Sequence, residues 1–124
     1  MGVRLALDFR YVNRHTISDA FPIRNIDDII QKIDNASCMS LFDATSAYWQ
    51  TEVQEEDCWK TGFICDDQLC EWTRSPFGLK CNGQTFCRAV QQVLYPVRDI
   101  AAGFVDDTVV YSYTLPKRCG TVLG

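Results

Sequence analysis

Two adjacent carboxylates interrupt an otherwise apolar run near the end of the chain. Asp106 and Asp107 lie within GFVDDTVVY, residues 103–111. Adjacent carboxylates repel each other, and the arrangement becomes favourable when a divalent cation binds between them and a third carboxylate. Asp43, which follows a second apolar run at residues 38–42, could supply that third group. Two such cations about 4 Å apart stabilise the entering and leaving oxygens of a phosphoryl transfer.

A polar turn between two strands explains Asp106 and Asp107 equally well. The same dipeptide occurs at residues 27–28, where it is typical of a helix start, and at residues 66–67, where it is typical of a turn. Spacing therefore does not distinguish a cation site from a turn, and both interpretations stay open at this point.

The elements that would position these carboxylates are predicted from hydrophobic periodicity. Residues 38–42 form a short apolar run that is typical of a buried strand, with Asp43 at its tip. Residues 100–105 and 108–113 are rich in β-branched and aromatic residues, which favour strands. The turn between these two strands is expected at Asp106-Asp107.

Two helices are indicated by apolar residues at helical spacing. Asn25 is a candidate N-cap, and isoleucines follow it at positions 26, 29, 30 and 33, forming one apolar stripe. A second helix is predicted over residues 83–97, with Pro96 marking its end or a kink.

The remaining segments predict strands and loops. Residues 4–9 alternate apolar and polar, which is typical of a half-buried strand, and residues 13–22 read as a loop. Residues 60–65 and 69–74 predict a hairpin with a loose connection, because its turn has no glycine. Together the elements predict an α+β fold, an antiparallel sheet with helices packed on one face.

Composition restricts the class of protein. The chain has 124 residues, enough for one domain, with 47% hydrophobic and 23% charged residues. Its net charge of −4 argues against a self-sufficient nucleic-acid binder. Its seven cysteines contain no Cys-x-x-Cys pair, and His15 is the only histidine, so a zinc site has no support. Many thiols and no export signal or membrane span favour a cytoplasmic protein without a membrane partner.

Several segments, in order, resemble sequence blocks of reverse transcriptases from gypsy-type LTR retrotransposon Pol polyproteins. RLALDFRYVN resembles R-x-x-x-D-[YF]-R-x-x-N, and LFDATSAYWQ resembles L-D-L-x-S-G-Y-x-Q. SPFGLK resembles M-P-F-G-L-K, and FVDD resembles Y-x-D-D. A lone Y-x-D-D would be weak support, whereas the ordered set is specific. The segments are RLALDFRYVN (4–13), TISDAFPI (16–23), LFDATSAYWQ (41–50), DCWKTGF (57–63), SPFGLK (75–80) and FVDD (104–107).

The resemblance implies a palm-type sheet and part of the fingers of a truncated right-hand RNA-directed DNA polymerase. It implies a catalytic and metal-binding set of Asp43, Asp106 and Asp107, with the Ala44 carbonyl helping to hold one of two Mg²⁺ ions, or Mn²⁺ in their place. The implied reaction is attack of a primer 3′-hydroxyl on the α-phosphate of a dNTP, with pyrophosphate leaving.

The resemblance also implies a substrate-binding set. Arg4 would contact the triphosphate, and Tyr48 would lie beneath the sugar and exclude a 2′-hydroxyl. Phe77 and Gly78 would shape the nucleotide pocket, and Lys80 would face template or primer. Structural alternatives stay open: packing of Tyr48 under the sheet, an ion pair of Arg4 with Asp8, and Phe77 as a buried anchor.

The sequence departs from the family at particular positions. Ala47 stands where Gly is usual before the tyrosine, and Phe104 stands where Tyr is usual. Residues 81–84, Cys-Asn-Gly-Gln, replace the more typical Asn-Ala-Pro-Ala. These substitutions put the activity of this copy in doubt while leaving the three aspartates intact.

The resemblance spans residues 1–113, a partial fingers and palm, and residues 114–124 form an unmatched C-terminal tail. The thumb, connection and RNase H domains of the full-length enzyme, which binds an RNA or DNA template-primer and dNTP, have no counterpart here. The chain is therefore expected to be inactive by itself. Two alternatives remain: a catalytically inactive retroelement remnant, or an interaction or cation-binding module that uses the same carboxylates.

Overall fold

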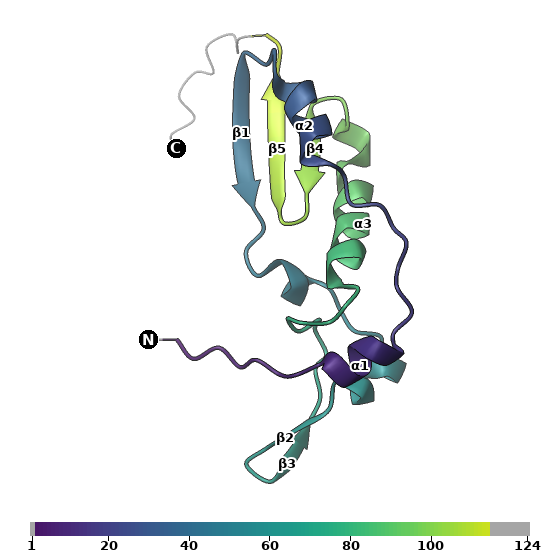
Figure 1. Cartoon of the computed structure of the whole chain (residues 1–124). Helices are drawn as coiled ribbons and strands as arrows, with labels where there is room; N and C mark the ends of the chain where they lie inside the picture. The colour runs from purple at the N-terminus through teal and green to yellow at the C-terminus, as the bar shows by residue number, and fades with distance from the viewer. Residues whose placement is uncertain (1, 115–124) are drawn as a thin grey trace.

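The computed structural model describes residues 2–114, and its elements fall into two regions (Figure 1). One region holds a three-stranded antiparallel sheet with helices α2 and α3 beside it, and the other holds α1 and a two-stranded hairpin. The predicted α+β class is confirmed. The helices and strands are α1 (Arg10–His15), α2 (Ile26–Ile33), β1 (Cys38–Asp43), β2 (Phe63–Cys65), β3 (Gln68–Cys70), α3 (Asn82–Leu94), β4 (Ala101–Phe104) and β5 (Asp107–Ser112), with 3₁₀ helices η1 (Ala47–Gln50), η2 (Glu55–Thr61) and η3 (Tyr95–Val97).

The main sheet has the order β1-β5-β4, so β5 is the central strand. The predicted strands at residues 38–42, 100–105 and 108–113 are confirmed to within one residue at each end. The predicted burial of β1 is wrong, because all six of its residues are exposed. Whether a strand is buried depends on what covers it, and no described element packs over β1. Its run of apolar residues therefore does not indicate burial.

Both predicted helices form. The Asn25 side chain accepts a hydrogen bond from the Asp27 N–H at 3.2 Å, which caps α2 as predicted. Ile29 of α2 then packs in the core cluster with Val109 and Tyr111 of β5. Helix α3 ends at Leu94, and Pro96 lies in the 3₁₀ turn that follows. No helix within residues 2–114 is long and apolar enough to cross a bilayer.

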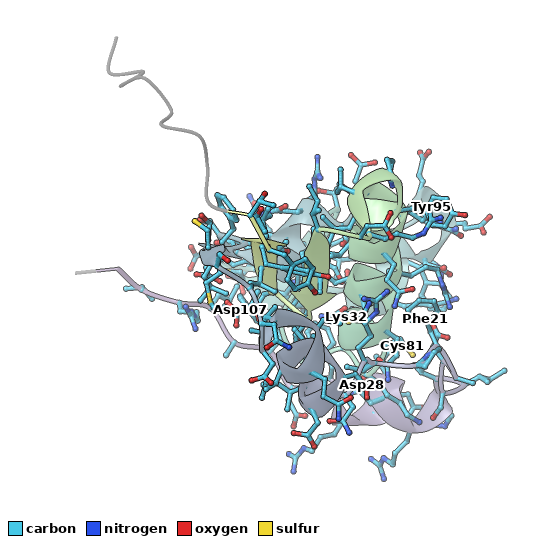
Figure 2. All side chains as sticks on the ribbon, turned by 90° about the horizontal axis from the view of Figure 1, so that it is seen from above. Phe21, Asp28, Lys32, Cys81, Tyr95 and Asp107 are labelled. Atoms are coloured by element: carbon cyan, nitrogen blue, oxygen red, sulfur yellow. The ribbon has the colours of Figure 1, made fainter. Side chains whose placement is uncertain are left out.

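The two helices approach different sides of β4, which corrects the expectation of helices on one face. Ala102 belongs to the cluster with Ile29, whereas the neighbouring Gly103 faces Val90 of α3. Successive residues of a strand point to opposite faces. Seen from above, α2 with Asp28 and Lys32 lies on one side of the strands, and α3 lies beyond β4 (Figure 2). The missing side chain of Gly103 leaves the room for α3.

The region around the hairpin differs more from the sequence prediction. Residues 4–9 form no strand, because an alternating segment needs a partner strand and none pairs with it among the described residues. Helix α1 forms instead from Arg10, overlapping the predicted loop. The β2–β3 turn is tight rather than loose: Asp66 and Asp67 both adopt left-handed backbone conformations, with φ of 48° and 59°. Aspartate tolerates this region better than most residues, so it replaces the expected glycine.

We expect Gly103→Ala to destabilise the protein by about 1–3 kcal/mol through overpacking. The added Cβ would lie 2.7 Å from Val90 Cγ1 and 3.3 Å from Leu94 Cδ1. Gly83→Ala in α3 is the matched control, because its Cβ would meet only Ile23 Cδ1, at 3.9 Å. Urea unfolding should show a lower midpoint for Gly103→Ala only. Equal midpoints for Gly103→Ala and the unsubstituted chain would contradict this packing.

Candidate active site

Strand pairing brings the predicted catalytic aspartates together at one end of the sheet. Asp43, the last residue of β1, is the direct partner of Asp107, the first residue of β5. Directly opposed residues of an antiparallel pair share a face, with Cβ atoms about 5 Å apart. Asp106 precedes Asp107 in the turn, and its carbonyl accepts a hydrogen bond from the Ala44 N–H at 2.8 Å. The loop after β1 is thereby attached to the β4–β5 turn.

The β4–β5 turn is displaced by one residue from the predicted position. Phe104 pairs with Asp107, so the turn consists of Val105 and Asp106, and Asp107 belongs to the strand. Val105 has a φ of 52°, a left-handed conformation that is strained for a β-branched residue. Such strain costs about 1–3 kcal/mol and persists only where the surroundings enforce it. The two-residue connection and the strand pairing on both sides of β5 enforce it here.

The donor chemistry of this end of the sheet fits a hard divalent cation. Asp43 and Asp107 are exposed, and neither forms an ion pair within residues 2–114. No group of three or more His, Cys, Asp or Glu side chains in that part of the chain is arranged to hold a metal ion. Mg²⁺ is usually held by one or two carboxylates together with substrate phosphates and water. Two facing carboxylates therefore fit part of a Mg²⁺ shell.

Three of the predicted substrate-binding residues meet in one aromatic cluster. The ring of Tyr48, in η1, packs edge-on against Phe77, with centroids 5.7 Å apart, and against Phe86 of α3 at 6.4 Å. The Arg4 guanidinium lies 5.2 Å from the centroid of Phe77. Arg4, Tyr48 and Phe77 come from distant parts of the chain, so folding, not sequence proximity, brings them together.

The alternative in which Arg4 pairs with Asp8 is wrong. Arg10 takes that place, with its Nε donating to both oxygens of the Asp8 carboxylate at 2.9 and 2.8 Å. These hydrogen bonds lower the pKa of Asp8 to about 2. The exposed Arg4 guanidinium consequently has no carboxylate partner within residues 2–114 and is available to an anion.

The remaining predicted residues are placed as follows. Gly78 has a φ of +95°, a conformation that favours glycine, and lies one residue from Phe77. Lys80 is directed elsewhere: its Nζ donates to the Thr16 carbonyl at 3.2 Å, and it contacts neither Arg4 nor the aspartates. Ala47, which replaces the usual glycine, is buried, and Ser46 before it takes the left-handed conformation with a φ of 51°.

Sequence reasoning missed two asparagines that hold the loop at residues 75–80. Asn13 of α1 donates from Nδ2 to the Gly78 carbonyl at 2.8 Å and accepts from the Lys80 N–H at 2.9 Å. The single side-chain amide of Asn13 thus satisfies two backbone groups, the Gly78 carbonyl and the Lys80 N–H, which fixes the backbone next to Phe77. The partners are more than sixty residues apart in sequence, so no local pattern indicates the contact.

The second asparagine, Asn82, is buried at the start of α3. Its Oδ1 accepts from the Ser75 hydroxyl at 2.5 Å, and its Nδ2 donates to the Pro76 carbonyl at 2.6 Å. The loop is therefore fastened from both sides, by Asn13 and by Asn82. The one sequence signal for Asn82 is that it replaces the alanine more typical of the resembled family.

Comparison with known proteins decides the family. The sequence matches the reverse transcriptase (RNA-dependent DNA polymerase) family over residues 1–123. The chain belongs to the reverse transcriptase family. It is 31% identical to an RNA-directed DNA polymerase homolog of Oenothera berteroana over 113 residues, covering 90% of this chain and 80% of that protein. The sequence-based assignment to reverse transcriptases is therefore confirmed.

Longer relatives include viral and transposon polyproteins. The chain is 32% identical to Polyprotein P3 of Commelina yellow mottle virus, covering 93% of this chain and 6% of the polyprotein. It is 30% identical to the Pol polyprotein from transposon 297 of Drosophila melanogaster, covering 96% and 11%. The chain thus spans a small part of these polyproteins. Because virus and transposon proteins match equally well, the gypsy-type origin is not confirmed.

Solved structures show the same fold. Foamy viral protease-reverse transcriptase in complex with an RNA/DNA hybrid is similar with a TM-score of 0.79 at 22% identity, over 90% of this chain and 15% of that one. The native Prototype Foamy Virus enzyme is similar with a TM-score of 0.77 at 25% identity, over 92% and 15%. The reverse transcriptase family generally uses divalent metal ions.

We expect Asn82→Ala to lower the free energy of unfolding by about 1–3 kcal/mol, because the Ser75 hydroxyl and the Pro76 carbonyl lose their buried partner. Gln92→Ala, on an exposed position of the same helix, is the control and should change stability little. Thermal and urea unfolding measure both variants. An Asn82→Ala protein as stable as the Gln92→Ala protein would show that Asn82 does not hold the loop.

Proposed function

We propose that this chain is the palm and part of the fingers of an RNA-directed DNA polymerase from the Pol polyprotein of a gypsy-type LTR retroelement. In this proposal it transfers a nucleotide from a dNTP to a primer 3′-hydroxyl. The observation that supports it most directly is the pairing of Asp43 with Asp107 beside Asp106. The proposed reaction is inferred from membership of the family. The β1–β5 pairing places together the carboxylates that this reaction needs.

The aspartates have the first role in the proposal. Asp43 and Asp107 would hold two Mg²⁺ ions, or Mn²⁺, from one face of the sheet, with Asp106 supplying a further carboxylate. The Ala44 carbonyl, next to Asp43, would help to hold one of these ions. When bound, such ions neutralise the charge that develops on the phosphate and the leaving pyrophosphate.

The aromatic cluster has the second role. The guanidinium of Arg4 would contact the triphosphate, since its planar donors match phosphate geometry. Phe77 holds Arg4 by a cation–π contact at 5.2 Å. Tyr48 packs edge-on against the same ring and would lie beneath the sugar, where its bulk excludes a 2′-hydroxyl. Gly78 and the asparagine-fastened loop would complete the pocket, and Lys80 would face template or primer.

The proposed partners are an RNA or DNA template-primer and a dNTP. The structural neighbours include foamy viral protease-reverse transcriptase in complex with an RNA/DNA hybrid and with double-stranded DNA, which supports nucleic acid as the partner. The net charge of −4 indicates that electrostatic attraction from this part of the protein alone is not enough to bind nucleic acid. Further segments, such as those of the polyprotein relatives, would supply the basic surface.

We expect Asp106→Asn to abolish primer extension when the chain is joined to the flanking segments of the transposon 297 polyprotein. The loss should reach about a hundredfold or more in rate, the scale found when one group that stabilises developing charge is removed. Asp66→Asn is the matched control, because Asp66 also precedes a second aspartate in a two-residue hairpin turn. It should extend the primer at the unsubstituted rate.

Either of two results would contradict the proposal. One is a folded, unsubstituted chimera that extends no primer with Mg²⁺ or Mn²⁺. The other is an Asp106→Asn chimera that is as active as the Asp66→Asn chimera. Circular dichroism of each variant distinguishes a lost reaction from a lost fold.

A further inference from the structure

One face of helix α3 contacts both sides of the candidate site. The helix begins beside η1 and runs along the sheet (Figure 1). Residues four apart share a face of a helix, and on this face Asn82, Phe86 and Val90 follow one another. Asn82 holds the loop at residues 75–80, and Val90 faces Gly103 of β4. The face thus connects the nucleotide side of the site with the strand that leads to the aspartates, and Phe86 lies in its middle.

Phe86 is the residue of α3 whose ring meets the ring of Tyr48. The two rings are nearly perpendicular, with an interplanar angle of 89° and centroids 6.4 Å apart. Phe86 is only 5% exposed, whereas Tyr48 is partly exposed. Closely packed interior side chains have little room to move, so the buried Phe86 ring gives the Tyr48 ring a fixed surface to rest on. The contact joins two segments of this chain, so it needs no flanking segment.

The local structure around Tyr48 does little to fix its ring. Tyr48 lies in η1, a 3₁₀ helix of four residues, and the N-cap Ser46 forms no side-chain cap hydrogen bond. The hydrogen-bond geometry of 3₁₀ helices is poorer than that of α-helices. The orientation of the ring therefore depends on tertiary contacts, which are Phe77 at 5.7 Å and Phe86 at 6.4 Å between centroids. Of these two, Phe86 belongs to a regular helix.

We propose that Phe86 is a positioning residue for nucleotide selection, which holds the Tyr48 ring where that ring excludes a 2′-hydroxyl. This role rests on the proposed function, in which Tyr48 lies beneath the sugar of the nucleotide. A steric block acts only if the blocking ring cannot move aside, and the perpendicular contact with Phe86 limits that movement. Loss of the contact therefore admits ribonucleotides more than it slows the incorporation of deoxyribonucleotides.

Primer extension by the chimera with transposon 297 segments, supplied with dNTPs or with rNTPs, tests this role. Phe86→Leu should lower the ratio of kcat/KM for dNTP to kcat/KM for rNTP by about two- to tenfold, the range to which one aromatic contact corresponds. Phe63→Leu is the matched control, because Phe63 of β2 also packs against an aromatic ring, that of Trp72, with centroids 6.0 Å apart. It should leave the ratio unchanged.

A double substitution distinguishes positioning from a general loosening of the fold. In a Tyr48→Ala chimera the blocking ring is absent, so adding Phe86→Leu should leave the dNTP-to-rNTP ratio as it is in Tyr48→Ala alone. A general loosening would lower the ratio in both backgrounds, and that result would overturn the positioning role.

NMR of the 124-residue chain with ¹³C-labelled tyrosine measures the contact without any activity. Phe86→Leu removes a ring next to Tyr48 and should shift the ring signals of Tyr48, whereas Phe63→Leu should leave them in place. Unchanged Tyr48 signals in Phe86→Leu, or an unchanged ratio in an active chimera, would overturn the role of Phe86 alone. A folded, unsubstituted chimera that extends no primer would overturn the proposed function, and the role of Phe86 with it.

Discussion

The pairing of β1 with β5 is the constraint on which the candidate site depends. Asp43 and Asp107 are sixty-four positions apart in sequence, and the register alone places them opposite each other. Two carboxylates facing each other on one sheet face are destabilising unless water or a cation screens them. The rest of the sheet sustains this arrangement: Ile29, Ala102, Val109 and Tyr111 bury the apolar face of β4 and β5 and hold the register.

A second constraint acts on the nucleotide side of the site. The loop at residues 75–80 has little regular structure, yet it is held by side-chain amides at both ends. Phe77 is therefore presented to Arg4 and Tyr48 from a fixed backbone. The turn at Val105 and the loop at residues 75–80 are both irregular segments near the candidate site. In each, contacts between residues distant in sequence hold the backbone in one conformation.

The sequence predicted the features that depend on local order. The isoleucine stripe of α2, its Asn25 cap and most of α3 follow from periodicity and capping, which act within a few residues. Features that depend on which other segments of the chain lie alongside were predicted wrongly. Strand β1 is exposed although apolar, and residues 4–9 alternate but find no partner strand.

Some residues of the candidate site were likewise predicted from the sequence, and others were not. Carboxylate chemistry and spacing raised the possibility of a cation site, but the same dipeptide at residues 27–28 and 66–67 kept a turn equally open. The ordered resemblance to reverse transcriptases singled out Asp43, Asp106 and Asp107, and the family assignment is confirmed. Asn13 and Asn82 escaped detection because each acts on a loop whose position only the fold determines.

The most direct test of the central claim is amide NMR of the isotopically labelled chain titrated with Mn²⁺ in the presence of a dNTP. The paramagnetic ion broadens signals near its binding site. We predict selective broadening at Asp43, Ala44, Asp106 and Asp107. Asp66 and Asp67 are the internal comparison, because they are adjacent carboxylates in a tight turn. The residues that flank this turn, Cys65 and Gln68, pair with each other, so no third carboxylate lies opposite. Equal broadening at both turns would contradict the claim that β1–β5 pairing builds a cation site.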